Sequence, residues 1–223
     1  MNGGAPYRPS EPKSGGRIHL ISTTEEALFV LRPRRGEGVV REILGEGFEG
    51  KVVVWDWWKA YPYGRWFLQR CWAHLLRVAK VGAEESARGK ELYQALCKVY
   101  ERLTRDLEKA SPRVRVRRRY WGEHHLVELV ERFGKSWAQG VRKFVTYLEN
   151  GRALWLTFLR YPGVEPTNNR AERSIREAVV IRKIIGTLRN VWGAEALTRL
   201  LSVLGTWKLR GEYPSANLYA VLS

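Results

Sequence analysis

The spacing of apolar positions predicts a hairpin, a helix and a buried strand near the start of the chain. RIHLIST (17–23) and EALFVLRP (26–33) have the character of two short strands joined by a turn. Apolar residues then recur at helical spacing over 36–48, which glycines close. The continuous apolar run KVVVWDWW (51–58) is typical of a strand that is buried on both faces. This succession predicts an α/β layered core.

Most of the remaining chain is predicted to be helical. The segment 65–81 starts as a possible strand and becomes a helix near Cys71, and an amphipathic helix follows over 84–109. A second long helix is expected over 123–150, with Trp137 on its apolar side. Further helices are expected over 153–160, over 168–210 with breaks near Gly186 and Gly193, and at the C-terminal end. The order of elements predicts a helical block of roughly 80 residues inserted between two parts of one core.

The chain is strongly basic, with a formal net charge of +16 and a pI of about 10.2. A protein of this charge commonly binds a polyanion, and nucleic acid is the first candidate. The alternatives are a basic surface that serves only solubility, and attraction to an acidic membrane. The arginines cluster, in RVRVRRRY above all, and no amphipathic lipid anchor accompanies them. No segment approaches the roughly 20 apolar residues of a membrane span, and two cysteines without a disulfide framework favour a reducing cytoplasm.

Asp56 is a candidate site residue because it stands at the end of the predicted buried strand. Open α/β sheets bind their ligands at the carboxyl ends of strands. The alternative is that Asp56 only ends the strand and begins a turn. The chain contains one other aspartate, Asp106, so a mechanism that requires several aspartates is heavily constrained.

Glu172 is the second candidate, within the stretch PTNNRAERSIRE (166–177). If Asn169 caps a helix, Glu172 occupies the partner position of a capping box, and that structural role explains both residues. On a persistent helix, Glu172, Arg176 and Lys183 also share one stripe. A carboxylate that precedes a stripe of basic side chains is more typical of an active-site surface that binds phosphates than of a buried core face. Two carboxylates from separate parts of a fold can hold Mg²⁺ or Mn²⁺, which assist phosphoryl transfer.

Several segments resemble the insertion sequence 66 family of DDE transposases. The matching stretches are VVVWDWWKAY (52–61), QRCWAHLLR (69–77), FLRYPGVEPTNNRAERSIREAVVIRK (158–183) and TWKLRGEYP (206–214). They spread over 52–214, and the NNRAER block followed by RK is the most specific. The resemblance implies a ribonuclease-H-like core with a helical insertion, which cleaves DNA and joins its ends with Mg²⁺ or Mn²⁺. It implies a prokaryotic protein of the cytoplasm that associates with the nucleoid, with a homo-oligomer as a candidate assembly.

The resemblance also implies roles for individual residues and boundaries for the domains. Asp56 matches the second aspartate of the metal-binding triad, and Glu172 matches its glutamate. The DNA-positioning residues are then Asn168, Asn169, Arg173, Arg176 and Lys183, and Arg182 joins them because it flanks the basic stripe of the same helix. The implied organisation is a disordered tail (1–16), the first part of the core (17–82), a helical insertion (83–160), and the glutamate-bearing helix with the C-terminal helices (161–223).

The sequence departs from the family at the first triad aspartate. That residue lies on an opening strand upstream of the hairpin in the family, whereas this sequence has no aspartate before Asp56. We therefore expect an N-terminally truncated core with two of three ligands and impaired strand transfer. Glu11, Glu25 and Glu26 stand in no matching context, and Trp57 replaces the usual glycine. The alternatives are a non-catalytic DNA-binding protein derived from such a core, and a purely helical packaging protein.

Three other groups have more than one interpretation. Zinc is not expected, because Cys71 and His74 form a single close pair and the adjacent His124 and His125 face different sides of a helix. We expect Cys71, Trp72 and His74 to be structural residues near the site. The aromatic residues around Asp56 suit either base stacking or core packing. Between the long helices we expect a basic segment that favours contact with the DNA backbone over a merely solvated loop, and its residues are Arg113, Arg115 and Arg117.

Overall fold

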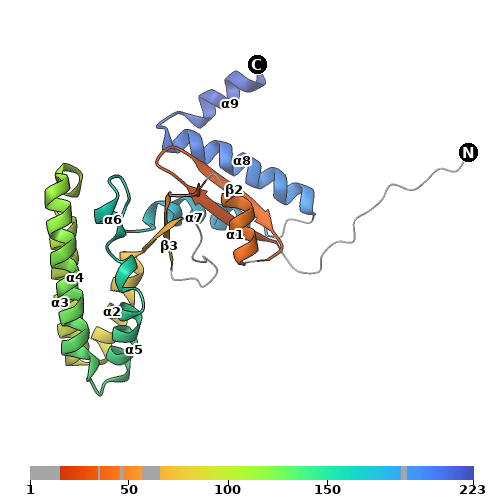
Figure 1. Ribbon diagram of the computed structural model, residues 1–223. Helices are drawn as coiled ribbons and strands as arrows, with labels where there is room; N and C mark the ends of the chain where they lie inside the picture. Colours follow the sequence, from red (N-terminus) through yellow and green to blue (C-terminus); the bar gives the residue numbers. More distant parts are fainter. Residues whose placement is uncertain (1–15, 35, 46–47, 57–65, 187–189) are drawn as a thin grey trace, which may run out of the picture. The chain divides into compact units, whose positions relative to one another are not determined.

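The computed structural model describes residues 16–34, 36–45, 48–56, 66–186 and 190–223 (Figure 1). Contacts along the chain divide it into two units, one formed by Met1–Ile43 with Arg170–Ser223 and the other by Leu44–Asn169. Within the described residues the chain combines helices with two small two-stranded sheets. The structure is therefore of mixed α/β type, as predicted, and a purely helical protein is excluded.

The first unit is built on the predicted hairpin. Strands β1 (Arg17–Ser22) and β2 (Ala27–Arg32) pair antiparallel, with Leu20 opposite Phe29. Helices α7 (Asn169–Ile185) and α8 (Val191–Leu209) bury one face of the hairpin, and α8 runs along β2 (Figure 1). The remaining elements of this unit are α1 (Glu37–Leu44) and α9 (Pro214–Leu222).

The second unit begins with two parallel strands and continues as a helical block. Strand β3 (Val52–Trp55) pairs with β4 (Phe67–Arg70), with Val53 opposite Leu68. The elements that follow are α2 (Trp72–Glu85), α3 (Ala87–Thr104), η2 (Leu107–Lys109), α4 (Pro112–Gly134), α5 (Gln139–Glu149), η3 (Arg152–Leu154) and α6 (Thr157–Arg160). The long helices α3 and α4 lie side by side (Figure 1).

The core of the second unit follows from helical periodicity. On α3 the buried residues Leu92, Leu96, Val99 and Leu103 recur every three or four positions and form one apolar stripe. Their side chains join a single hydrophobic cluster with residues of α2, α4, α5 and α6. The Ser86 hydroxyl caps α3 by accepting a hydrogen bond from the Gly89 N–H at 3.0 Å. Local capping and the apolar stripe therefore favour the same helix.

Gln69 ties strand β4 to the segment that carries α6. The side chain is fully buried, and its Nε2 donates to the Arg70 and Trp155 carbonyl oxygens at 2.6 and 3.2 Å. Its Oε1 accepts from the Phe158 N–H at 2.7 Å. A buried amide with satisfied donors and acceptor fixes the end of the strand, because leaving any of these groups unpaired costs free energy. This is the end of the strand at which the candidate site begins.

The prediction of one helix over 123–150 was wrong. Helix α4 starts at Pro112 and ends at Gly134, α5 starts at Gln139, and Trp137 in the connection is 92% exposed. The arginine run therefore lies on a helix, not on an inter-helix loop. Ser111 and Pro112 explain the early start, because the Ser111 hydroxyl accepts from the Val114 N–H at 3.4 Å and proline suits the first helical turn.

The predicted break near Gly193 was also wrong, whereas the break near Gly186 is confirmed. Gly186 follows α7 with φ of +78°, a conformation that glycine adopts without steric cost. Gly193 lies in the first turn of α8, where its N–H donates to Asn190 Oδ1 at 2.7 Å. The glycine therefore takes part in an N-cap and does not interrupt a helix.

Candidate functional site

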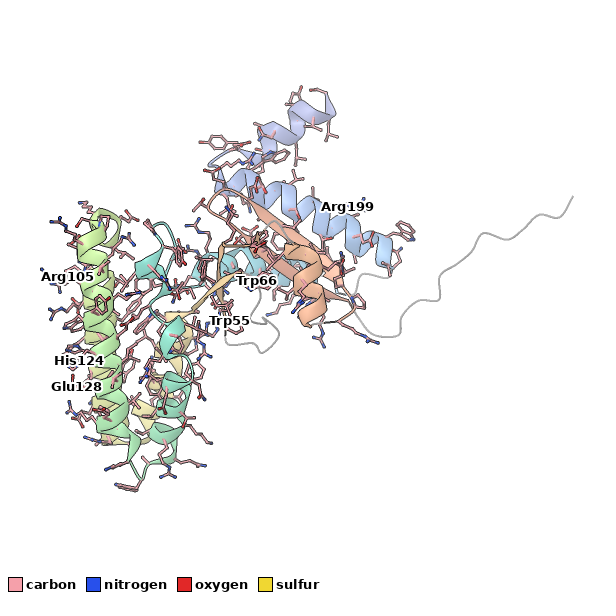
Figure 2. All side chains as sticks on the ribbon, in the orientation of Figure 1. Trp55, Trp66, Arg105, His124, Glu128 and Arg199 are labelled. Atoms are coloured by element: carbon pink, nitrogen blue, oxygen red, sulfur yellow. The ribbon has the colours of Figure 1, made fainter. Side chains whose placement is uncertain are left out.

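Asp56 follows β3 directly and is exposed, as predicted for a carboxylate at the carboxyl end of a strand. The preceding residue, Trp55 (labelled in Figure 2), is 7% exposed. The strand therefore anchors its last apolar side chain in the unit and presents the next residue to solvent. The neighbouring aromatic residues Trp57, Trp58, Tyr61 and Tyr63 lie outside the described residues, so their stacking or packing role stays a prediction.

The half-buried phenol of Tyr147 and the buried guanidinium of Arg70 lie near Asp56 in the second unit. Burial raises the pKa of Tyr147 to about 12; Arg70 opposes this rise, and the negative charges of Cys71 and Asp56 add to it. The Arg70 guanidinium lies 5.3 Å from the Trp155 ring and 6.0 Å from the Tyr147 ring. Sequence reasoning did not single out Arg70 or Tyr147. Arg70 belongs to the QRCWAH segment and is the last residue of strand β4. Its position at the end of a strand was the sequence signal that could have identified it.

Cys71 and His74 interact at the start of α2. Burial raises the pKa of the Cys71 thiol, but hydrogen bonds from His74 and from the Asn168 N–H favour the thiolate more strongly and lower the pKa overall. The Asn168 N–H lies 3.2 Å from Cys71 Sγ. The Trp72 N–H also donates to the Pro166 carbonyl oxygen at 2.9 Å. The segment that precedes α7 is therefore held against the start of α2 by hydrogen bonds.

Trp72 is a core residue of the second unit. Its side chain is fully buried, and its Nε1 donates to the Trp155 carbonyl oxygen at 2.6 Å. The two indole rings meet edge to face at 6.2 Å between centroids. A burial this complete leaves no surface for a ligand, and it agrees with the structural role expected for Trp72.

Helix α7 presents the second candidate carboxylate in its first turn. The helix extends without interruption from Asn169 to Ile185, so Glu172, Arg176 and Lys183 lie on one stripe of it, as the spacing required. The helix includes Asn169 as its first residue. If Asn169 were the N-cap, the helix would begin one residue later, at Arg170. Ala178 and Ile181 pack into the core of the first unit. The exposed basic residues on this helix are Arg173, Arg176, Arg182 and Lys183.

A cavity of about 490 Å³ lies beside α7 in the first unit. Phe29, Leu201 and Leu209 give it an apolar part, and Arg170, Arg173 and Lys208 line it with positive charge. Lys208 is paired with Glu177, whose carboxylate oxygens lie 2.8 and 2.9 Å from its Nζ. Glu177 also lines the cavity, so its charged lining combines three basic side chains with one carboxylate.

Arg115 must be removed from the predicted DNA contacts. It is 8% exposed, and its guanidinium donates to the carbonyl oxygens of Leu107 at 2.8 Å, Phe158 at 3.3 Å and Ala110 at 3.3 Å. These bonds hold α4 to η2 and α6, so the side chain is not available to a phosphate. Arg113 and Arg117 are exposed on the same helix and remain candidates.

The other titratable groups singled out in the sequence have local partners. The His125 ring stacks on the Trp121 ring at 3.9 Å, and its Nδ1 lies 2.8 Å from the Trp121 carbonyl oxygen. The exposed His124 is its neighbour on α4 (Figure 2). Asp106 lies between α3 and η2 with φ of 47°, an exposed turn position in the helical unit. These residues have structural explanations that do not require a ligand.

Asp56 belongs to the second unit and Glu172 to the first, and each is described within its own unit. The predicted meeting of their carboxylates stays a prediction. Within the second unit the structure brings together Cys71, His74 and Asn168.

Among the described residues, no helix is long and apolar enough to cross a membrane.

Comparisons with known proteins provide the evolutionary context of these residues. The family model described as "Transposase IS66 family" matches residues 6–196, which include Asp56, the Cys71–His74 pair and all of α7. Neither the comparison with curated proteins nor that with solved structures returned a match. Membership of a transposase family points to DNA as the partner and, in general, to a dependence on divalent metal ions. Because the model matches most of the chain, this protein belongs to the IS66 family of transposases.

Proposed function

We propose that the chain is the core of a DNA transposase that cleaves and joins DNA strands, with Asp56 and Glu172 as ligands of Mg²⁺ or Mn²⁺. The observation that carries this proposal is the first turn of α7, where a carboxylate precedes exposed basic side chains on one helix of a family transposase. The proposal requires the two carboxylates to approach one another when the protein binds metal and DNA.

The donor chemistry fits the proposed ions. Mg²⁺ and Mn²⁺ prefer carboxylate oxygens, and Asp56 provides an exposed one at the end of a strand. Bound divalent ions activate a hydroxyl or water and stabilise the leaving oxygen in phosphoryl transfer. The chain's own task is to hold the ligands and the DNA in place. Zinc is not proposed, because Cys71 and His74 form a single close pair, whereas structural zinc sites take four ligands, commonly as two such pairs.

The basic residues of α7 and α4 position the DNA backbone in this proposal. Arg173, Arg176, Arg182 and Lys183 contact phosphates from α7, and Arg113 and Arg117 do so from α4. The Asn168 and Asn169 side chains contribute polar contacts at the start of α7. A net charge of +16 strengthens such binding and makes it dependent on salt.

The ribonuclease-H-like organisation is part of the same proposal. The core comprises 17–82 and 161–223, the insertion comprises 83–160, and 1–16 is a tail. The antiparallel hairpin, the parallel pair that ends at Asp56 and the late helix with Glu172 support this order. We further propose a cytoplasmic, nucleoid-associated protein that acts as a homo-oligomer.

A second function, DNA binding without cleavage, is favoured by the aspartate content. Asp106 lies in a turn of the helical unit, so Asp56 is the single aspartate suited to the site. We propose that this polypeptide alone has two of three ligands and therefore binds metal weakly and cleaves DNA poorly. A derived DNA-binding protein retains the basic helix and loses the chemistry.

Metal binding tests the ligand assignment directly. We expect Asp56→Asn and Glu172→Gln each to weaken Mn²⁺ binding, measured by electron paramagnetic resonance, by at least roughly tenfold, because each removes one charged oxygen ligand. Asp106→Asn and Glu128→Gln are matched controls that remove exposed carboxylates elsewhere and leave the affinity unchanged. Equal Mn²⁺ affinity in all variants contradicts the ligand assignment.

Plasmid nicking in the same variants separates the two functions. Weak Mn²⁺-dependent nicking by the unaltered chain, lost in both ligand variants, supports a transposase core. DNA binding without nicking supports the non-catalytic function, and efficient strand transfer by this polypeptide alone overturns the proposed impairment. An affinity for DNA that does not fall with rising salt contradicts both functions.

A further inference from the structure

The arginine run of α4 contains two residues that the helical unit does not use. Arg115 is bonded within the core, and the Arg118 guanidinium donates to the Arg105 carbonyl oxygen at 2.5 Å. Arg113 and Arg117 are exposed, and among the residues that the structure describes neither of them forms an ion pair. Their charge is therefore available to a partner outside the chain.

These two arginines begin a stripe of exposed residues along α4. At about 100° per residue, six exposed positions fall within about 80° of one another, opposite the buried positions of the helix. We call this set the outer stripe, and it consists of Arg113, Arg117, Tyr120, His124, Glu128 and Glu131. Figure 2 labels two of these residues, His124 and Glu128. The stripe is basic at its start, aromatic in its middle and acidic at its end.

The charges of the outer stripe are segregated by sign. Arg113 and Arg117 lie one turn apart, as do Glu128 and Glu131, and like charges at this spacing slightly destabilise a helix. Within the described part of the chain, neither of these glutamates forms an ion pair. The stability of α4 itself therefore does not explain this order. A surface with the opposite order of charges would complement both ends.

A second copy of α4 that runs antiparallel presents the opposite order. A contact across a two-fold axis brings the same patch of two copies together, so each pair of residues occurs twice. If the axis passes near Gly122, Arg113 lies opposite Glu131 of the second copy. In the same register, Arg117 lies opposite Glu128 of the second copy. Four opposite-charge pairs therefore form along the two helices.

The same register brings aromatic and apolar side chains together at the centre. Tyr120, which is 60% exposed, lies opposite His124 of the second copy. Val116 is 50% exposed and flanks the stripe on the same side as Val127. Because a two-fold axis between antiparallel helices keeps each flank on its own side, Val116 meets Val127 of the second copy. Both the charged ends and the centre of the stripe are therefore self-complementary.

A DNA backbone complements only the first half of the outer stripe. Glu128 and Glu131 repel phosphates, so DNA that runs along α4 does not account for the acidic half. In an antiparallel pair, Arg113 and Arg117 are occupied by carboxylates, and their proposed contacts with DNA are available to the single copy. The basic residues of α7 belong to the other unit and are not used by this pairing.

We propose that the outer stripe of α4 is an interface through which two copies of this chain pair antiparallel. The inference rests on the homo-oligomer proposed above and assigns its contact surface. Charge complementarity sets the direction and register of the pair. One pair of helices is small beside the roughly 1,200–2,000 Å² of stable interfaces, and a charge of +16 on each copy opposes association. The dimer is therefore weak, reversible and sensitive to salt.

Charge reversal in the full chain tests the interface, with the dimer dissociation constant measured by sedimentation velocity. Arg113→Glu combined with Arg117→Glu gives the stripe acidic charges alone. Glu128→Arg combined with Glu131→Arg gives it basic charges alone. Each double variant places like charges opposite one another and should weaken the dimer at least roughly tenfold. The two variants change the net charge in opposite directions, so a loss in both does not arise from net charge.

The fourfold variant that combines all these substitutions exchanges the basic and acidic halves of the stripe. It should restore the dissociation constant to within about threefold, because every opposite-charge pair is rebuilt with its partners exchanged. An equimolar mixture of the two double variants should also pair. Lys80→Glu combined with Lys90→Glu is the matched control, since it reverses two exposed charges on α2 and α3 and should not weaken the dimer. Circular dichroism verifies that each variant is folded.

The possible outcomes separate this interface from the other proposals. An unaltered chain that stays monomeric up to the solubility limit contradicts both the homo-oligomer and the interface. A dimer that neither double variant weakens contradicts the interface alone. Reduced DNA affinity in the arginine variant, with an unchanged dimer, assigns Arg113 and Arg117 to DNA only. A folded fourfold variant that does not regain the dimer contradicts the antiparallel pairing.

Discussion

At the scale of single residues, the position on the helix decides what a charged side chain does. The buried positions of α4 are Arg115, Gly122, Leu126, Leu129 and Phe133, spaced by seven, four, three and four residues. Arg115 therefore begins the core stripe, although Arg113 and Arg117 on either side of it are exposed. Hydrophobic periodicity does not reveal the first half of this stripe, because an arginine and a glycine occupy its first two positions.

We expect Arg115→Ala to lower the free energy of unfolding by about 2–3 kcal/mol, because three carbonyl oxygens lose a charged donor and a cavity remains. Arg117→Ala, two residues away and exposed, should change it by less than about 0.5 kcal/mol. Urea denaturation followed by tryptophan fluorescence measures both. A larger loss for Arg117→Ala than for Arg115→Ala would contradict the assignment of Arg115 to the core.

At the scale of elements, capping residues in the sequence mark where helices begin, but hydrophobic periodicity alone does not locate these starts. Ser111 and Pro112 mark the start of α4, and Asn190 marks the start of α8, yet the sequence prediction missed both starts. Hydrophobic periodicity alone joined α4 to α5, because apolar residues continue on both sides of the connection. Periodicity measures which face is apolar, but it does not reveal that the chain changes direction between two helices that share a core.

The contact between α2 and α3 depends on a glycine. A Cβ atom at Gly89 would overlap the Gly82 carbonyl oxygen and lie 2.5 Å from its carbonyl carbon. We expect Gly89→Ala to lower the free energy of unfolding by at least about 2 kcal/mol, because backbone atoms have no other position to take. Circular dichroism during thermal unfolding measures the effect.

Gly134→Ala is the matched control for this helix contact. A Cβ atom at Gly134 meets nothing nearer than Val145 Cγ1, at an ordinary 3.8 Å. This substitution should leave stability unchanged or raise it by up to about 1 kcal/mol, since alanine favours a helix over glycine. Equal destabilisation by the two substitutions would show that the loss at Gly89 does not arise from the approach of α2 and α3.

At the scale of the whole molecule, the two units differ in how the chain builds them. The second unit is one continuous segment with its own large core, whereas the first combines segments from both ends of the chain. We expect a fragment of residues 44–169 to fold on its own, with helical circular dichroism and a cooperative thermal transition. A fragment that melts gradually, without a cooperative transition, would show that the helical block depends on the rest of the chain.

The sequence by itself determined the hairpin, the strand that ends at Asp56, the helix that carries Glu172 and the family, because these depend on local periodicity and on a contiguous motif. Only the tertiary structure decided that Arg115 is a core residue, that Arg70 and Tyr147 accompany Asp56, and that α8 seals the edge of β2. Each of these facts depends on at least one contact between residues that lie far apart in the chain, such as the bond from Arg115 to the Phe158 carbonyl oxygen. No short window of sequence contains both partners of such a contact.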